Sequence, residues 1–288
     1  PPSELIINPD GSIYHLNLKP EQIAKNIITV GDPDRVGEVS KYFDSIECKI
    51  QKREFVTHTG ELNGTRISVI STGIGTDNID IVLNELDALA NIDFETRIEK
   101  EEHTSLNIIR IGTSGSMQKD IAVNTLLISE YGIGIDGLLH FYDYKNNADE
   151  HMTFLHFMET AGSEINFPIR PYIASASKKL IDTLGQNFLK GITLTCPGFY
   201  APQGRVLRND IAVPNLIENL RKFNHNNLQC TNFEMETAGI YGLSNVFGHQ
   251  AISFNAILAN RITNEFSTNP KIIIEKLIKT VLNRVSKL

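Results

Sequence analysis

The order of apolar runs, glycine turns and helical segments constrains the fold of this chain more than any other feature. Four runs rich in β-branched residues end in glycine-containing turns, as buried strands do, at residues 27–30, 67–70, 107–111 and 126–128. An apolar run at residues 251–258 predicts a further strand. Apolar residues with helical spacing occupy residues 79–89 and, after a proline, 270–285. We therefore predict an α/β fold with a central mixed β-sheet flanked by helices.

The composition fits one large domain and argues against several classes of partner. The chain has 288 residues, 41% of them hydrophobic, so residues 1–288 are expected to form one α/β domain. Its net charge of −7 argues against nonspecific binding of nucleic acid, which needs clustered Lys and Arg. No apolar run approaches the roughly 20 residues that span a bilayer, so we expect no membrane partner.

Cysteine usage and the N-terminus point to the cytoplasm. Cys48, Cys196 and Cys230 are widely spaced and odd in number, so they form neither a disulfide framework nor a metal motif. We therefore expect a reducing compartment and no metal. The first residues lack the basic and apolar regions of a signal peptide, which also favours a cytoplasmic location. Residues 93–104 and 143–150 are charged or polar and are predicted to be solvated surface excursions.

Two strand ends carry groups suited to an anion. Gly31 follows a strand and lets a backbone N–H approach an anion, while Arg35 can contact two phosphate oxygens. An ordinary turn with a surface arginine is the alternative. Arg110 precedes a glycine turn in which the hydroxyls of Thr113 and Ser114 can form an anion nest. A structural ion pair of Arg110 is the alternative there.

A second glycine loop is less informative. Residues 73–78 open a helix and partly match a dinucleotide-binding fingerprint, but Asn78 stands at the third glycine position. A helix start packed closely on a strand is the better interpretation, and a Rossmann dehydrogenase is disfavoured.

Two further segments suit a sugar and a planar ring. Glu234, Met235 and Glu236 begin a helical segment, and a carboxylate there can accept hydrogen bonds from two vicinal hydroxyls. Stabilisation of the helix dipole is the alternative role. Phe199, Gln203 and Arg205 place a flat ring, an amide that both donates and accepts, and a guanidinium on one turn-rich segment. That set can hold a polar heterocycle, and a surface loop is the alternative.

Eight motifs, in this order, resemble the purine nucleoside and uridine phosphorylase superfamily, and within it the uridine phosphorylases. They are H-L (15–16), G-D-P-D-R (31–35), R-E-F (53–55), S-T-G-I-G (71–75), R-I-G-T-S-G (110–115), F-x-x-x-Q-x-R (199–205), E-M-E (234–236) and N-R (260–261). The resemblance implies the nucleoside phosphorylase fold, in a homodimer or a larger assembly such as a hexamer. The segments 93–104 and 143–168 look inserted relative to that family and could change the assembly.

The resemblance also implies residue roles. The phosphate would be held by Gly31, Arg35, Arg110 and Thr113, with Arg53 reaching in from the neighbouring subunit. The ribose would be held by Met235, Glu236 and Arg110, together with Glu234, and by His15 from the neighbour at its 5′ side. The base would be held by Phe199, Gln203 and Arg205, with Ser114 and Gly115 lining the pocket and Arg261 helping to organise the base loop. Catalysis would depend mainly on Arg205, Gln203 and Arg110.

The implied reaction is reversible phosphorolysis of uridine to uracil and ribose 1-phosphate. Inorganic phosphate would be the co-substrate, and no cofactor or metal would be needed. Purine-specific relatives place an aspartate on the strand end after E-M-E, whereas this chain has Asn260 in that stretch. Three alternatives stay open. They are a phosphorylase for another nucleoside (a purine or deoxypyrimidine nucleoside), a nucleosidase that uses water, and a noncatalytic nucleoside sensor.

Overall fold

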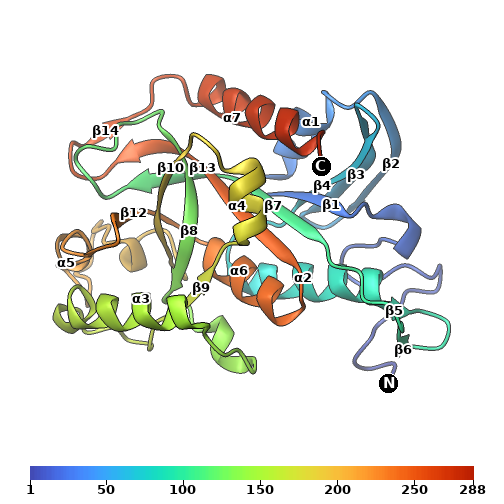
Figure 1. The fold of residues 1–288 in the computed structure, drawn as a ribbon, viewed down its shortest axis with the longest axis horizontal. Helices are drawn as coiled ribbons and strands as arrows, with labels where there is room; N and C mark the ends of the chain where they lie inside the picture. Colours follow the sequence, from blue (N-terminus) through green and yellow to red (C-terminus); the bar gives the residue numbers. More distant parts are fainter.

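The computed structural model describes all residues, 1–288, and is built on a twelve-stranded mixed sheet (Figure 1). The strands are β1 (Asn26–Val30), β2 (Ser45–Lys52), β3 (Phe55–Leu62), β4 (Thr65–Ser71), β5 (Ile92–Asp93), β6 (Ile98–Glu99), β7 (Asn107–Ser116), β8 (Leu126–Gly134), β9 (Tyr172–Ser175), β10 (Leu189–Thr195), β11 (Asn224–His225), β12 (Leu228–Glu234), β13 (Gln250–Asn260) and β14 (Glu265–Phe266). The helices are α1 (Pro33–Ser40), α2 (Thr76–Asn91), α3 (Ala148–Glu159), α4 (Lys178–Leu184), α5 (Leu216–Leu220), α6 (Thr237–Val246) and α7 (Pro270–Val285). Four short 3-10 helices are η1 (Pro20–Gln22), η2 (Leu138–Phe141), η3 (Gly162–Glu164) and η4 (Ala201–Gln203).

Part of the sheet closes on itself. Hydrogen bonding runs in the order β12, β10, β8, β13, β7, and β7 then pairs with β12, so these strands form a barrel. From β7 the sheet continues as an open wing of β1, β4, β3 and β2. Strands β1, β4 and β7 are parallel, whereas β13 and β8 are antiparallel, which confirms the predicted mixed α/β fold. The proposal that residues 1–288 form one domain stays a prediction.

Helices cover the sheet on both sides. In Figure 1, α7 runs along one side of the sheet, while α2 and α6 lie together on the other. The apolar positions predicted for the helix at 79–89 are all buried in α2: Ile79, Val82, Leu83, Leu86 and Leu89. Helix α7 begins at Pro270, as predicted, and buries Leu277 and Val281. No helix of the structure combines the length and the apolar character needed to cross a bilayer.

Two of the predicted glycine turns are strands instead. Strand β7 continues through residues 112–115 and β8 continues through Gly132 and Gly134. These glycines serve close packing rather than a change of direction. A Cβ on Gly132 would lie 2.8 Å from Cα of Ala238 in α6, and one on Gly112 would overlap the guanidinium of Arg110. Because glycine has no side chain, α6 packs directly against β8 at Gly132 and the guanidinium of Arg110 packs directly against β7 at Gly112.

The two polar stretches differ. Residues 93–104 form an exposed excursion around the β5–β6 hairpin, as predicted. The prediction for residues 143–150 is wrong at its end, because Glu150 in α3 is 0% exposed. Its carboxylate accepts hydrogen bonds from the hydroxyl of Tyr144 at 2.6 Å and from the backbone N–H groups of Asn147 and Ser175. A buried carboxylate that is fully hydrogen-bonded anchors this loop to β9.

Candidate active site

A cavity of about 790 Å³ lies where β1, β4, β7, β12 and β13 end. Its volume is within the range of small-molecule sites, about 300–1,000 Å³. Twelve residues proposed from the sequence line it: Gly31, Arg35, Arg110, Thr113, Ser114, Gly115, Phe199, Gln203, Arg205, Glu234, Met235 and Glu236. The sequence reasoning did not propose the other lining residues, which are Asp32, Pro33, Glu54, Gly73, Ile74, Asn78, Gly112, Phe233, Leu258, Ala259 and Phe266.

One end of the cavity holds two guanidinium groups. Arg35 comes from the first turn of α1, where the Asp32 carboxylate caps the helix and Pro33 occupies the first helical position. Nε of Arg35 is buried and has no hydrogen-bond partner. Burial lowers the pKa of Arg35, and the positive charge of Arg110 lowers it further. Two like charges with an unused buried donor make this end of the cavity suited to an anion.

Arg110 forms a structural ion pair with Glu234 and Glu236 and also lines the cavity. Its Nη2 donates to Glu236 Oε2 at 2.7 Å and lies 3.2 Å from Glu234 Oε2. Its Nη1 donates to Asn255 Oδ1 at 3.0 Å. Burial alone would lower the pKa of Arg110, but the two carboxylates together raise it. Arg110 is therefore held in one orientation as a permanent cation.

Glu234 and Glu236 have different surroundings. Glu234 ends β12, and its carboxylate accepts hydrogen bonds from Thr195 Oγ1 at 2.6 Å and from the backbone N–H of Glu236 and Thr237. It thereby caps α6, which begins after the E-M-E motif rather than within it. Glu236 accepts only from the backbone N–H of Gly75, at 2.9 Å, and from Arg110. Burial raises the pKa of Glu236, and Arg110 partly offsets that rise.

The other end of the cavity is formed by the F-x-x-x-Q-x-R segment. Cζ of Arg205 lies 3.8 Å from the centre of the Phe199 ring, and its Nη1 donates to Gln203 Oε1 at 2.6 Å. Because arginine has no acceptor, this bond fixes the amide of Gln203 and leaves its Nε2 as a free donor. Burial, and then the charge of Arg261, lower the pKa of Arg205 to about 10.

Arg261 supports this segment from outside the cavity. Its guanidinium donates to the carbonyl oxygens of Gln203 at 2.9 Å and Gly204 at 3.3 Å. Gly204 has a φ of 68°, a left-handed conformation that favours glycine. Arg261 therefore holds the turn that presents Gln203 and Arg205.

Two predicted residues lie away from the main cavity. The ring of His15 contacts Glu85 Oε1 through Nδ1 at 2.6 Å and lines a separate cavity of about 500 Å³. Glu85 also accepts from the backbone N–H of His15 and Leu16, which fixes this turn. Arg53 is exposed in the turn between β2 and β3. Neither His15 nor Arg53 lines the main cavity, which twelve other predicted residues line.

Residues 25–285 match the model of the phosphorylase superfamily. The chain belongs to the phosphorylase superfamily. Superfamily members similar to it include a uridine phosphorylase of Thermococcus kodakarensis, 32% identical over 89% of this chain and 80% of that protein. A uridine phosphorylase of Haemophilus influenzae is 28% identical over 96% of this chain and 98% of that protein.

A solved superfamily structure is also similar. It is a Trypanosoma brucei nucleoside phosphorylase that shows uridine phosphorylase activity, with a TM-score of 0.89 and 30% sequence identity. The alignment covers 99% of this chain and 100% of that chain. The eight motifs therefore identified the correct superfamily, and the nucleoside phosphorylase fold is confirmed.

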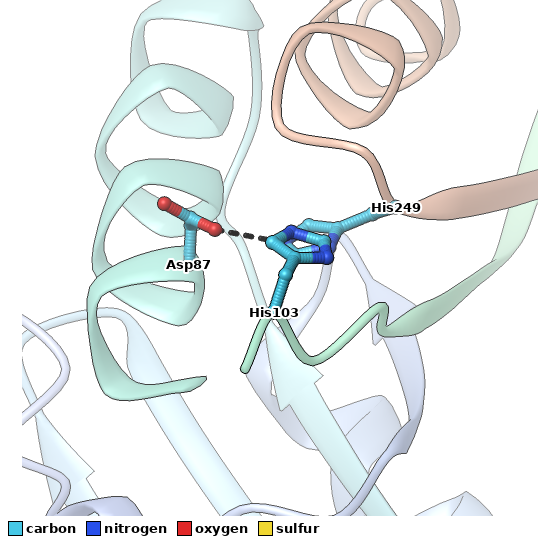
Figure 2. Close-up of side chains that lie close together, drawn as sticks. All are labelled: Asp87, His103 and His249. Atoms are coloured by element: carbon cyan, nitrogen blue, oxygen red, sulfur yellow. Dashed lines mark ion pairs between the residues drawn. The ribbon is translucent and has the colours of Figure 1, made fainter. Parts of the chain in front are cut away.

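A second cluster of ligand-type side chains lies apart from the superfamily site. Figure 2 shows Asp87 of α2 facing His249, with the ring of His103 beside it. Nδ1 of His249 accepts the backbone N–H of Leu106 at 3.3 Å, so the neutral ring carries its proton on Nε2, 3.3 Å from Asp87 Oδ1. A metal ion at Nε2 would force that proton onto Nδ1, which already faces the N–H of Leu106. The contact instead ties α2 to the start of β13.

Proposed function

We propose that this chain is a uridine phosphorylase, which converts uridine and phosphate reversibly to uracil and ribose 1-phosphate. The observation that carries the proposal is the presence, in one cavity, of the Arg35–Arg110 pair and the Gln203–Arg205 pair. The first pair suits an anion, and the second suits a ring with carbonyl oxygens. The relatives named uridine phosphorylase support the same substrate.

Phosphate would bind beside Arg35 and Arg110, with Gly31 and Thr113 completing the site. The buried Nε–H of Arg35 has no hydrogen-bond partner and can donate to a phosphate oxygen. Binding of a dianion would also offset the repulsion between the guanidinium groups of Arg35 and Arg110. The phosphate oxygen attacks the anomeric carbon as the bond to the base nitrogen breaks, through an oxocarbenium-like state. The dianion itself stabilises the positive charge of that state.

The ribose would lie against Met235 and Glu236. Glu236 is fixed on one side by Arg110 and on the other by the N–H of Gly75. The lone pairs that these bonds leave free can accept hydrogen bonds from ribose hydroxyls. For Glu234 we propose an indirect role, because its carboxylate is already occupied by the start of α6 and by Thr195.

The base would lie beside Phe199 with its carbonyl oxygens near Gln203 and Arg205. When the glycosidic bond breaks, the electron pair passes to the base nitrogen and its charge spreads onto the carbonyl oxygens. Two fixed donors can stabilise that anion without a strong acid. Asn260 does not supply an acid, because its amide is bonded to the carbonyls of Gln118 and Ile121 and to the N–H of Ile262. This arrangement disfavours purine nucleosides as the main substrate.

We further propose that the site is shared between two subunits of a homodimer or a larger assembly such as a hexamer, with His15 and Arg53 contributed by the neighbour. The positions of both residues outside the main cavity support this. We propose no cofactor or metal for the reaction, since positioning and charge suffice for phosphorolysis. A cytoplasmic location is supported by the three free cysteines.

The test is release of uracil from uridine, with and without phosphate, with inosine as the competing substrate. Phosphate-dependent release from uridine, with little turnover of inosine, is the expected result. Release without phosphate would mean that the enzyme is a nucleosidase, and a preference for inosine would reassign the base. No turnover of any nucleoside, together with measurable uridine binding, would favour a sensor.

A further inference from the structure

Buried polar side chains form a continuous hydrogen-bonded chain inside the barrel. This hydrogen-bond network begins at the side chain of Arg110 on β7. It passes through one side chain each on β13, β8, β10 and β12 and returns to β7 at Ser114. Its inner members are Asn255, Ser129, Thr193 and Asn232, each 0% exposed. Burying this many polar groups is costly unless each one is satisfied, so the direction of each bond is constrained.

The first half of the chain is fixed by Arg110. A guanidinium can only donate, so Nη1 of Arg110 must face Oδ1 of Asn255, at 3.0 Å. The amide nitrogen of Asn255 then faces Ser129 and donates to its hydroxyl oxygen at 3.2 Å. Ser129 has one proton, which remains to be donated onward.

The second half continues in the same direction. Oγ of Ser129 lies 2.5 Å from Oγ1 of Thr193, which in turn donates to Oδ1 of Asn232 at 2.9 Å. If the amide of Asn232 were reversed, Thr193 would have to donate to Ser129. The buried proton of Ser129 would then have no acceptor, which costs about 1–3 kcal/mol.

The last bond determines what faces the cavity. With its oxygen toward Thr193, Asn232 donates through Nδ2 to Oγ of Ser114 at 3.0 Å. The hydroxyl proton of Ser114 has no acceptor within this network, and Ser114 lines the cavity. Asn232 itself does not line the cavity, so it acts only through Ser114.

We infer that Asn232 is a positioning residue, which fixes the hydroxyl of Ser114 as a hydrogen-bond donor toward a carbonyl oxygen of the base. This inference rests on the proposed function. A fixed donor favours rings with an oxygen at that position and disfavours rings with an amino group there, because two donors would then face each other. Ser114 would thus add to the discrimination made by Gln203 and Arg205.

A double-mutant cycle tests this role. Ser114→Ala, Asn232→Leu and the double variant are compared with the wild-type enzyme for the KM of uridine, the KM of phosphate and kcat. Asn91→Leu is the matched control, because Asn91 is also buried and hydrogen-bonded but lies at the end of α2, outside the cavity. Thermal unfolding of every variant shows whether the fold is kept, and Asn232→Ala replaces Asn232→Leu if the latter does not fold.

One hydrogen bond to an uncharged group corresponds to a change of roughly three- to tenfold in KM. We expect each single variant to raise the KM of uridine by that factor and to change the KM of phosphate by less than about twofold. The double variant should have a KM for uridine no higher than that of the more impaired single variant, because both changes remove the same interaction.

Three results would overturn the inference. They are multiplicative effects in the double variant, an equal rise in the KM of phosphate, and an unchanged KM of uridine in Asn232→Leu. If the wild-type enzyme itself releases no uracil, the proposed function is refuted, and the ligand of Ser114 with it. An active wild-type enzyme with multiplicative variants refutes only the role of Asn232.

Discussion

Replacement of Arg205 by alanine is the most direct test of the base site. The side chain makes a charged hydrogen bond to Gln203 Oε1 at 2.6 Å and stacks 3.8 Å from the centre of Phe199. The stacking is worth about 0.5–2 kcal/mol and keeps the guanidinium in place. Loss of one donor to a developing anion costs about 2.7–4 kcal/mol, or a factor of roughly 10²–10³ in kcat. We therefore expect kcat for uridine to fall by at least about 100-fold.

The same change should leave phosphate binding nearly intact. Arg205 belongs to the segment after β10, whereas Arg35 and Arg110 belong to α1 and β7. Initial rates of uracil release at varied phosphate and varied uridine give the two KM values and kcat separately. Arg208→Ala is the matched control, because Arg208 is an exposed arginine of the same loop that does not line the cavity. A rise in the KM of phosphate as large as the loss of kcat would show that this loop has been assigned to the wrong substrate.

Three further changes test other parts of the structure. Arg35→Gln should raise the KM of phosphate at least about tenfold with little effect on the KM of uridine, because it removes one of the paired charges; equal effects on both substrates in steady-state kinetics would contradict the phosphate assignment. Gly132→Ala should lower the free energy of unfolding by about 1–3 kcal/mol, since its Cβ would lie 2.8 Å from Cα of Ala238, whereas Gly37→Ala, with open space around it, should not; differential scanning calorimetry compares the two. Burial alone would raise the pKa of Asp87, but hydrogen bonds to His249 and Asn91 hold it below its usual value. The Asp87 carboxylate therefore stabilises the fold above about pH 4, and this stabilisation is lost as the pH falls through the pKa of the folded state. Chemical denaturation at several pH values should then show a shallower acid dependence for Asp87→Asn, and identical curves would contradict this reasoning.

Short sequence patterns predicted those features that depend on residues close together in the chain. Gly31 and Arg35 follow β1 directly, and the apolar spacing of α2 and α7 is visible within a few turns of chain. The eight motifs, found in the order of the family, identified the superfamily. Twelve of the predicted residues line one cavity, in part because β1, β4 and β7 are parallel and end on the same edge.

Features that depend on distant partners were not predictable. Gly132 was interpreted as a turn residue because nothing in the sequence shows that α6 will pack on it more than 100 residues later. The roles of Asn232 and Asn255 are not visible in the sequence, because the partners of a polar residue in a strand are set by the strands beside it. Glu150 looked like part of a solvated loop, and only the fold brings Tyr144 and Ser175 to its carboxylate.

The closure of β7 onto β12 has a consequence for how the protein is made. Arg110 is buried against Glu236, 126 residues later in the chain, and Glu236 in turn binds the N–H of Gly75 across 161 residues. A nascent chain that ends before β12 holds Arg110 but neither of the carboxylates that pair with it, Glu234 and Glu236. Such a fragment would bury an unpaired cation, and it also lacks β13, which lies between β8 and β7, so the barrel can close only after β13 has been made. Pairing over such separations is also slow. Ligand binding should therefore be acquired in one late step of biosynthesis, after which every part of the cavity is present at once.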